Sequence, residues 1–266
     1  MNTVDKTAEE LVRELNNLEK AEAIQGRLIE LGKKAVPALA DFLHERPGNF
    51  RPRSLAAGAL RIIDGQEAFD ALVKGLNIFL LVEDPVVALD EEAVKNRIAS
   101  ELKYFGEQAI GPLLDALGKQ RLVGAAESLA ELNEKRAVPY LIELLEDSFK
   151  RSRISDAILK FGSAALEKLI GTTKFKKLEG GLETPQSIER RAAAARLIGV
   201  IGGEVAFSRL AELLYDYDEN DLVRCEAALH LLRSTSGHIH EKAQAIIRNA
   251  LADPELARRL KYEEIF

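Results

Sequence analysis

The chain has 266 residues, a net charge of −6 at pH 7 and an isoelectric point near 5.5. This negative charge argues against a general affinity for nucleic acid, because phosphate backbones favour basic surfaces. A single cysteine, Cys225, excludes an internal disulfide and a thiolate zinc site. Apolar residues make up 47% of the chain, with Leu, Ala and Ile prominent and Trp absent, which is typical of closely packed helices.

The N-terminal segment, residues 1–19, predicts one amphipathic helix over about residues 5–18. It has no basic stretch followed by an apolar one, so we expect no signal peptide. No apolar run in the sequence approaches the ~20 residues that cross a membrane as a helix. We therefore expect a cytoplasmic protein that does not bind membranes.

A repeated helical pattern begins after residue 20. In six places an apolar anchor residue is followed by leucine three residues later, and in five of them leucine recurs seven residues after the anchor. These offsets place the side chains on one face of a helix. The anchors are Val36, Phe69, Ile110, Val138, Leu166 and Phe207, and Thr173 is the exception to the second leucine. A unit of this length that recurs along a chain predicts a stacked solenoid.

Another helix precedes each anchor helix and ends at a residue that tolerates a left-handed backbone. These residues are Gly32, Asp64–Gly65, Gly106, Asn133, Gly162 and Gly202. The sequence therefore predicts about seven helix pairs, over residues 20–45, 52–76, 90–118, 121–147, 149–172, 187–215 and 220–251. Residues 1–19 and 252–266 would cap the two ends, and we expect one continuous domain over residues 1–266.

A basic residue stands at one fixed place in the first helix of five pairs. These residues are Arg53, Lys95, Arg151, Arg191 and Arg224, whereas Leu122 breaks the rule. Together with the pattern AVPxLxxxL in second helices, this pattern resembles HEAT repeats, most closely the short bacterial variety also found in phycobilisome lyases. The resemblance covers about residues 20–251 and implies an all-α fold, a right-handed α-α superhelix, in a bacterial-type cell.

The resemblance implies a structural role for the basic row, because in HEAT proteins this position usually pairs with an acid in the same or the adjacent repeat. The alternative is a row that binds phosphates, which would make the protein nucleic-acid-associated. No aromatic side chains are interleaved with the row, and nearby acids can neutralise its charge. We therefore do not expect nucleic acid as the partner.

A first insertion, residues 77–91, interrupts the even spacing and is unusually apolar for a loop. Two interpretations remain open. The second helix continues and Val86–Leu89 folds back onto the core, or the segment is an exposed apolar patch for a partner or a second copy. In the second interpretation the contact residues are Ile78, Phe79, Leu80 and Leu81.

A second insertion, residues 172–186, is polar and has Gly180–Gly181 at its tip. Both insertions follow a second helix, so we expect them on the same edge of the solenoid. This one predicts a disordered surface loop, or a flexible basic arm for an acidic partner. The basic residues of the arm are Lys174, Lys176 and Lys177.

Acidic residues recur five positions after the anchors, on the polar side of the second helix. They are Asp41, Asp115, Glu143 and Glu212, whereas Lys74 and Gly171 occupy this place in the other two units. Second helices tend to line the concave surface of HEAT solenoids, so the resemblance implies an acidic track there. Such a track would attract a basic peptide or protein, although a plain solvated helix face explains the pattern too.

Known catalytic motifs are not apparent in the sequence. His-Glu occurs at His44 and His240, which falls short of the four such motifs of the di-iron HEAT enzyme deoxyhypusine hydroxylase. The acidic stretch 216–220 begins like an EF-hand loop, but Asp221 stands where that loop requires Gly. We therefore expect no metal, no cofactor and no enzymatic activity.

These observations predict a non-enzymatic scaffold for protein–protein interaction, built from HEAT-like repeats. It would bind a partner protein or peptide, with a basic surface favoured, through its concave face and its two insertions. We expect a monomer or a weak homodimer. The sequence does not identify the partner.

Overall fold

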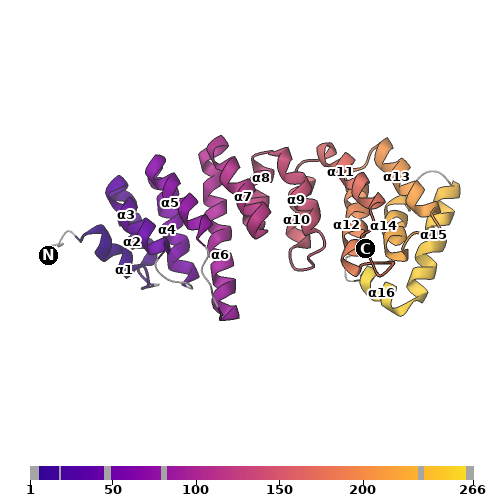
Figure 1. Ribbon diagram of the computed structural model, residues 1–266, viewed down its shortest axis with the longest axis horizontal. Helices are drawn as coiled ribbons and strands as arrows, with labels where there is room; N and C mark the ends of the chain where they lie inside the picture. The colour runs from indigo at the N-terminus through magenta and orange to yellow at the C-terminus, as the bar shows by residue number, and fades with distance from the viewer. Residues whose placement is uncertain (1–5, 18, 45–48, 79–82, 233–236, 262–266) are drawn as a thin grey trace. The chain divides into compact units, whose positions relative to one another are not determined.

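The computed structural model describes residues 6–17, 19–44, 49–78, 83–232 and 237–261. These residues are helical, apart from turns, linkers and one short hairpin (Figure 1). They form two compact units, Met1–Glu134 and Lys135–Phe266. Among the helices described, none is long and apolar enough to cross a membrane.

The first unit contains three successive pairs of helices and the first helix of a fourth. Its helices are α1 (Ala8–Glu14), α2 (Ala21–Glu30), α3 (Val36–His44), α4 (Phe50–Ile63), α5 (Gln66–Asn77), α6 (Pro85–Leu102), α7 (Ile110–Gln120) and α8 (Val123–Glu131). Short 3₁₀ helices lie at Gly32–Ala35 and Lys103–Ala109. The first helices α2, α4, α6 and α8 pack in chain order, and so do the second helices α3, α5 and α7 (Figure 1).

The second unit continues the same arrangement. It opens with a 3₁₀ helix at Lys135–Ala137, followed by α9 (Val138–Leu144), α10 (Arg151–Leu159) and α11 (Ser163–Lys174). After strands β1 (Leu178–Glu179) and β2 (Leu182–Glu183) come α12 (Pro185–Ile201), α13 (Glu204–Tyr215), α14 (Asp221–Leu231), α15 (Gly237–Ala252) and α16 (Pro254–Lys261). First helices α10, α12 and α14 contact one another in order, as do second helices α9, α11, α13 and α15.

The predicted fold class, an all-α stack of HEAT-like helix pairs with short helices at both ends, is confirmed. The boundary between the two units falls inside the fourth pair, because α8 belongs to the first unit and α9 to the second. The single-domain organisation over residues 1–266 stays a prediction.

The leucine pattern forms the core. The leucines three residues after each anchor, Leu39, Leu72, Leu113, Leu141, Leu169 and Leu210, are all buried. The first helices end at left-handed residues where the sequence predicted them, including Gly106 and Asn133. The anchors themselves are less uniform: Val36, Phe69 and Val138 are buried, Ile110 and Leu166 are half-buried, and Phe207 is 38% exposed. The alanine that directly precedes each anchor is buried in all six repeats.

The first insertion lengthens a first helix rather than a second one. Helix α5 ends at Asn77, whereas α6 begins at Pro85, directly after its N-cap Asp84. The prediction that Val86–Leu89 folds back onto the core was wrong for its two ends, because Val86 is 69% and Leu89 is 68% exposed. Ile78 is half-buried, and Phe79, Leu80 and Leu81 lie outside the described residues.

The second insertion is a β-hairpin, so the prediction of a disordered loop was wrong. Leu178 pairs with Glu183 and Glu179 with Leu182 across a two-residue turn. The turn residues Gly180 and Gly181 have φ angles of 60° and 83°, the left-handed values that such tight hairpin turns require. Thr184 then caps α12, since its hydroxyl accepts a hydrogen bond from the Ser187 N–H.

Candidate functional site

The basic row of the first helices contacts the ends of the second helices. Arg53 donates to the carbonyl oxygen of Leu43, Arg151 to that of Leu145 and Arg191 to that of Thr173, with Nε···O distances of 3.1, 2.7 and 3.1 Å. Each acceptor stands seven residues after the anchor of the preceding second helix. The last carbonyls of a helix have no partner within the helix, so these arginines satisfy them.

Two helix pairs have no arginine at this position, and the carbonyl of the preceding second helix is satisfied by other means. Where Lys95 replaces arginine, its ammonium binds Gln120 Oε1 at 2.8 Å, and Gln120 Nε2 donates to the Leu76 carbonyl at 3.0 Å. Where Leu122 stands, the backbone N–H of Arg121 donates to the Leu117 carbonyl at 3.0 Å. Lys95 therefore keeps the contact between successive pairs through Gln120, whereas at Leu122 the carbonyl is satisfied by the C-terminal turn of its own helix, α7.

Three arginines of the row, which we call the inner arginines, each bind a carboxylate from the following helix pair. They are Arg53, Arg151 and Arg191. Glu91 pairs with Arg53, and Glu189 lies 2.8 Å from Arg151. Glu219, just before α14, pairs with Arg191. Arg53 and Arg191 are buried, so their charges interact with carboxylates inside the fold.

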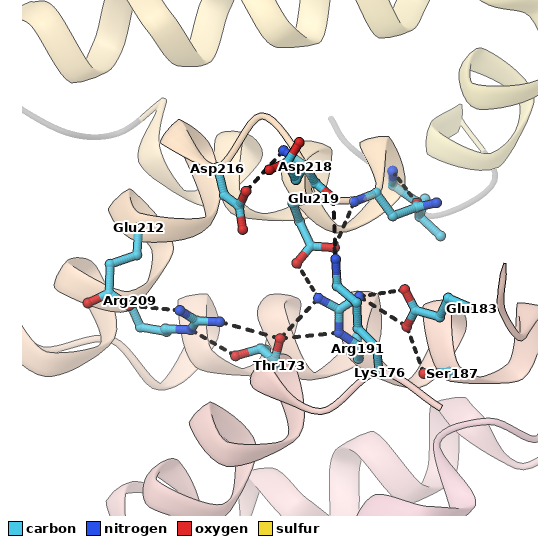
Figure 2. A network of polar contacts seen from close by, with 12 residues as sticks. Thr173, Lys176, Glu183, Ser187, Arg191, Arg209, Glu212, Asp216, Asp218 and Glu219 are labelled. Atoms are coloured by element: carbon cyan, nitrogen blue, oxygen red, sulfur yellow. Dashed lines mark hydrogen bonds and ion pairs between the residues drawn. The ribbon is translucent and has the colours of Figure 1, made fainter. Parts of the chain in front are cut away.

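Arg191 is the centre of a polar network in the second unit (Figure 2). Its guanidinium lies between Glu183 of the hairpin, at 2.8 Å, and Glu219 of the α13–α14 linker. Its carbonyl partner belongs to Thr173, which also accepts a hydrogen bond at its hydroxyl from Arg209 Nε at 2.9 Å. In the sequence, Thr173 is the exception among the leucines seven residues after an anchor. A polar residue at such a buried position is the sequence signal that pointed to this network.

The network fixes the hairpin and part of the predicted basic arm. Lys176 donates to the Asp218 carbonyl at 3.3 Å and lies 3.7 Å from the Glu219 carboxylate. The backbone N–H of Lys177 donates to Ser187 Oγ at 3.0 Å, whereas its side chain and that of Lys174 are exposed. Of the three lysines, two therefore point their charges into solvent.

A second buried carboxylate, Glu226 of α14, lies beside this row. Its carboxylate is 2.7 Å from the guanidinium of Arg196 on α12. Burial nevertheless raises the pKa of Glu226 above its usual range, because desolvation of the charged form outweighs the attraction of Arg196 and of the more distant Arg151.

We expect Glu226 to make stability depend on pH. The folded state holds the Glu226 proton more tightly than the unfolded chain, so its contribution is fully present below the ordinary pKa of 4.5 and is lost as the pH rises toward the raised folded-state pKa. Glu226→Gln cannot ionise and should remove this dependence. Urea unfolding at a series of pH values should show the stability of the wild type, relative to that of the variant, falling as pH rises; a rising difference would contradict this assignment.

The acidic positions of the second helices are exposed, two in each unit. Asp41 and Asp115 belong to the first unit, and Glu143 and Glu212 to the second. Two of them are paired within their own helix, Asp115 with Lys119 at 2.8 Å and Glu212 with Arg209 at 2.7 Å. Asp41 borders a pocket of about 360 Å³ between α1 and α3.

The fourth acid, Glu143, borders an open groove between the second helices α9 and α11. This groove, which we call the α9–α11 groove, has a volume of about 480 Å³. It is lined by Pro139, Ile142, Glu143, Glu167, Lys168, Gly171, Thr172, Phe175 and Arg190. Gly171 holds the position five residues after its anchor, and a Cβ there would meet no atom within 4 Å. Phe175, at the C-terminal end of α11, is 66% exposed.

Nucleophilic and metal-binding groups do not converge in the described part of the chain. No group of three or more His, Cys, Asp or Glu side chains there could hold a metal ion. Cys225 is buried, and desolvation raises the pKa of its thiol to about 12, which keeps it neutral.

Comparisons with known proteins agree with the repeat. Residues 122–147 match the family model of the PBS lyase HEAT-like repeat, and they span α8 and α9. No curated protein matches the sequence. Among solved structures, human deoxyhypusine hydroxylase in complex with glycerol is similar, with 17% identity, a TM-score of 0.33, and coverage of 91% of this chain and 96% of that chain. The complex of CpcE and CpcF of phycocyanin lyase from Nostoc is also similar, with 18% identity, a TM-score of 0.36, and coverage of 92% and 97%.

The prediction that the chain is not an enzyme was wrong. It rested on the missing catalytic motifs, whereas the solved structures similar to this chain include a hydroxylase and a lyase. At these identities and TM-scores the similarity carries neither reaction over to this chain. The resemblance to short HEAT repeats is confirmed: the fold is a stack of HEAT-like helix pairs, and residues 122–147 match the PBS lyase HEAT-like repeat.

Proposed function

We propose that this protein binds a partner protein or peptide through the α9–α11 groove. The observation that carries the proposal is the open space at Gly171, between the carboxylate of Glu143 and the exposed ring of Phe175. The equivalent position of the other five repeats holds a charged side chain, as Asp41 and Glu212 illustrate. The groove therefore includes the one such position that lacks a side chain.

The lining of the groove favours a segment that presents an apolar side chain next to a basic one. Phe175, Pro139 and Ile142 offer apolar surface, and a volume of about 480 Å³ lies within the range of ligand pockets. Glu143 and Glu167 are exposed carboxylates at its border, whereas Arg190 supplies a partly buried positive charge. A basic residue of the partner would lie near the two carboxylates, which steer its approach.

The N-terminal turns of α6 are a second proposed contact surface, on the first unit. Val86 and Leu89 are three residues apart, on one helix face, and both are more than two-thirds exposed. The helix extends beyond its neighbours at this end (Figure 1). An apolar helix face without a neighbour is a frequent feature of protein–protein contacts. The partner, a cytoplasmic location and the oligomeric state stay predictions.

The alternative of nucleic-acid binding by the arginine row is not favoured by the structure. Arg53 and Arg191 are buried and bind both a carbonyl and a carboxylate. A phosphate would have to displace both partners at each position. Arg53 and Arg191 are therefore closed to a phosphate backbone.

Site-specific photo-crosslinking tests the proposed groove. A benzophenone amino acid replaces Glu143 in the groove or, as control, Asp156, an exposed acid on first helix α10 of the same unit. We expect a defined protein adduct in cell lysate from position 143 and none from position 156. Gly171→Glu fills the groove and should abolish the adduct while retaining helicity, because Glu is a better helix former than Gly by about 0.5 kcal/mol.

The matched control is Gly111→Glu on α7, where an added Cβ also meets no atom within 4 Å. This variant should keep the adduct at position 143. Equal adducts at positions 143 and 156, or an adduct that survives Gly171→Glu, would refute binding in the groove.

A further inference from the structure

Arg224 is the last arginine of the row and differs from the inner ones. The inner arginines each receive a carboxylate from the following helix pair, namely Glu91, Glu189 or Glu219. Helix α14 is the last first helix that is followed by its own second helix, α15, whose side chains beside Arg224 include Lys242 and Asn249. Among the described residues, Arg224 therefore has no carboxylate from a following helix pair, and its ion-pair partner is Asp221 of its own helix.

The remaining bonds of Arg224 are weak. Its Nη2 lies 3.4 Å from the Leu214 carbonyl, and its Nη1 lies 3.6 Å from Asp221. Its Nε is buried and has no hydrogen-bond partner. A buried donor without an acceptor costs free energy, so this guanidinium has unused capacity to bind an anion.

A pocket of about 470 Å³ between α14 and α15 opens onto this guanidinium. Tyr217 lies at its edge, 75% exposed, with Lys242 Nζ 4.6 Å and Arg224 Cζ 5.5 Å from the ring centroid. Lys242 also donates a hydrogen bond to the Tyr217 hydroxyl at 3.1 Å. Two cations and an aromatic face therefore border one cavity.

Two carboxylates also line the pocket, and both have partners. Asp221 is exposed and lies near Arg224 Nη1, at 3.6 Å. Asp253 accepts a hydrogen bond from the Glu255 N–H at the start of α16. The hydrogen bond from Lys242 and the charges of Lys242 and Arg224 lower the pKa of Tyr217.

We propose that the α14–α15 pocket binds a small carboxylate ligand with a planar apolar part. The carboxylate occupies the place that a glutamate takes beside each inner arginine, and it accepts hydrogen bonds from Arg224 and Lys242. The planar part lies against the exposed face of Tyr217. This site is independent of the α9–α11 groove.

Titration of the full chain with sodium benzoate tests this site, with NMR detection of the arginine Nε–H groups. Benzamide, which has the same shape and no charge, is the control ligand. We expect a saturable shift of the Arg224 Nε–H signal with benzoate and none with benzamide. Lys242→Met should weaken benzoate binding about two- to fivefold, the effect of losing one exposed charge.

Arg248→Met is the matched control variant, because Arg248 is an exposed cation of the same helix outside the pocket. It should leave benzoate binding unchanged. The acids Glu263 and Glu264 of the chain itself are a second source of carboxylate, so the titration is repeated with Glu263→Gln and Glu264→Gln combined. A response only in that variant also supports a carboxylate site, one that the chain's own acids fill.

Three results would overturn the proposal. The first is the absence of a saturable shift in both the wild type and the glutamine variant. The second is an equal response to benzoate and benzamide, which would show binding without recognition of charge. The third is an equal loss of affinity in Lys242→Met and Arg248→Met.

Discussion

Arg191→Met is expected to destabilise the protein by about 3–5 kcal/mol, the usual cost of removing one partner from a buried ion pair. The variant would leave the buried carboxylate of Glu219 with only the more distant Lys176, at 3.7 Å, and the partly buried carboxylate of Glu183 without its arginine. The Thr173 carbonyl would lose its closest side-chain donor. Whole domains are stable by only about 5–15 kcal/mol, so this loss is a large fraction. Urea unfolding followed by far-ultraviolet circular dichroism measures it.

Arg151→Met is the matched control for this prediction. Its partner Glu189 is partly exposed, so water can solvate the carboxylate once the arginine is gone. We expect a loss of about 1.5–3 kcal/mol, which is typical of hydrogen bonds with a charged partner. Replacing Arg191, Glu183 and Glu219 together with apolar residues should restore much of the stability. A cost for Arg191→Met no larger than that for Arg151→Met would show that the buried network is not what holds this region.

Gly124→Ala is expected to destabilise the protein by about 2–3 kcal/mol, as overpacking of a close helix contact does. A Cβ at this place in α8 would lie 2.4 Å from the carbonyl oxygen and 2.8 Å from the Cα of Asn96 in α6. These are backbone atoms, so the two first helices must separate. The hydrogen bond from the Gly124 N–H to Asn96 Oδ1, at 2.8 Å, would lengthen with them.

Gly171→Ala is the control for this contact. It adds the same methyl group to a helix where no atom lies within 4 Å, so it should raise stability by up to about 1 kcal/mol through helix propensity. Thermal unfolding of the two variants should therefore change in opposite directions. A Gly124→Ala variant as stable as the wild type would mean that α6 and α8 do not pack this closely.

The fold could be predicted because the repeat acts through local physics. Leucines at offsets of three and seven mark a helix face, and Gly or Asn marks a helix end, whatever the rest of the chain does. The exposure of Phe207 was not visible in the sequence, because how far an anchor side chain is covered depends on its packing against neighbouring helices. The hairpin at Gly180–Gly181 was missed because its strands have two residues each, too short for an alternating pattern.

The sites were less accessible to prediction because they depend on contacts between repeats. The sequence places Arg191 in a row, but not the two glutamates that meet it from residues 183 and 219. The sequence showed Thr173 as an exception to the leucine pattern. It could not show that the backbone carbonyl of Thr173 accepts hydrogen bonds from Arg191, because every residue has a backbone carbonyl. The groove at Gly171 depends in the same way on the spacing of α9 and α11.

The account rests on the claim that Arg53, Arg151 and Arg191 are bound within the fold and do not bind nucleic acid. An NMR measurement of hydrogen exchange at the arginine Nε–H groups, with and without duplex DNA, tests it most directly. We predict slow exchange for Arg53, Arg151 and Arg191, whose Nε atoms donate to helix-end carbonyls, and no change when DNA is added. Fast exchange at these three groups, or shifts with DNA that disappear as salt rises, would contradict the claim.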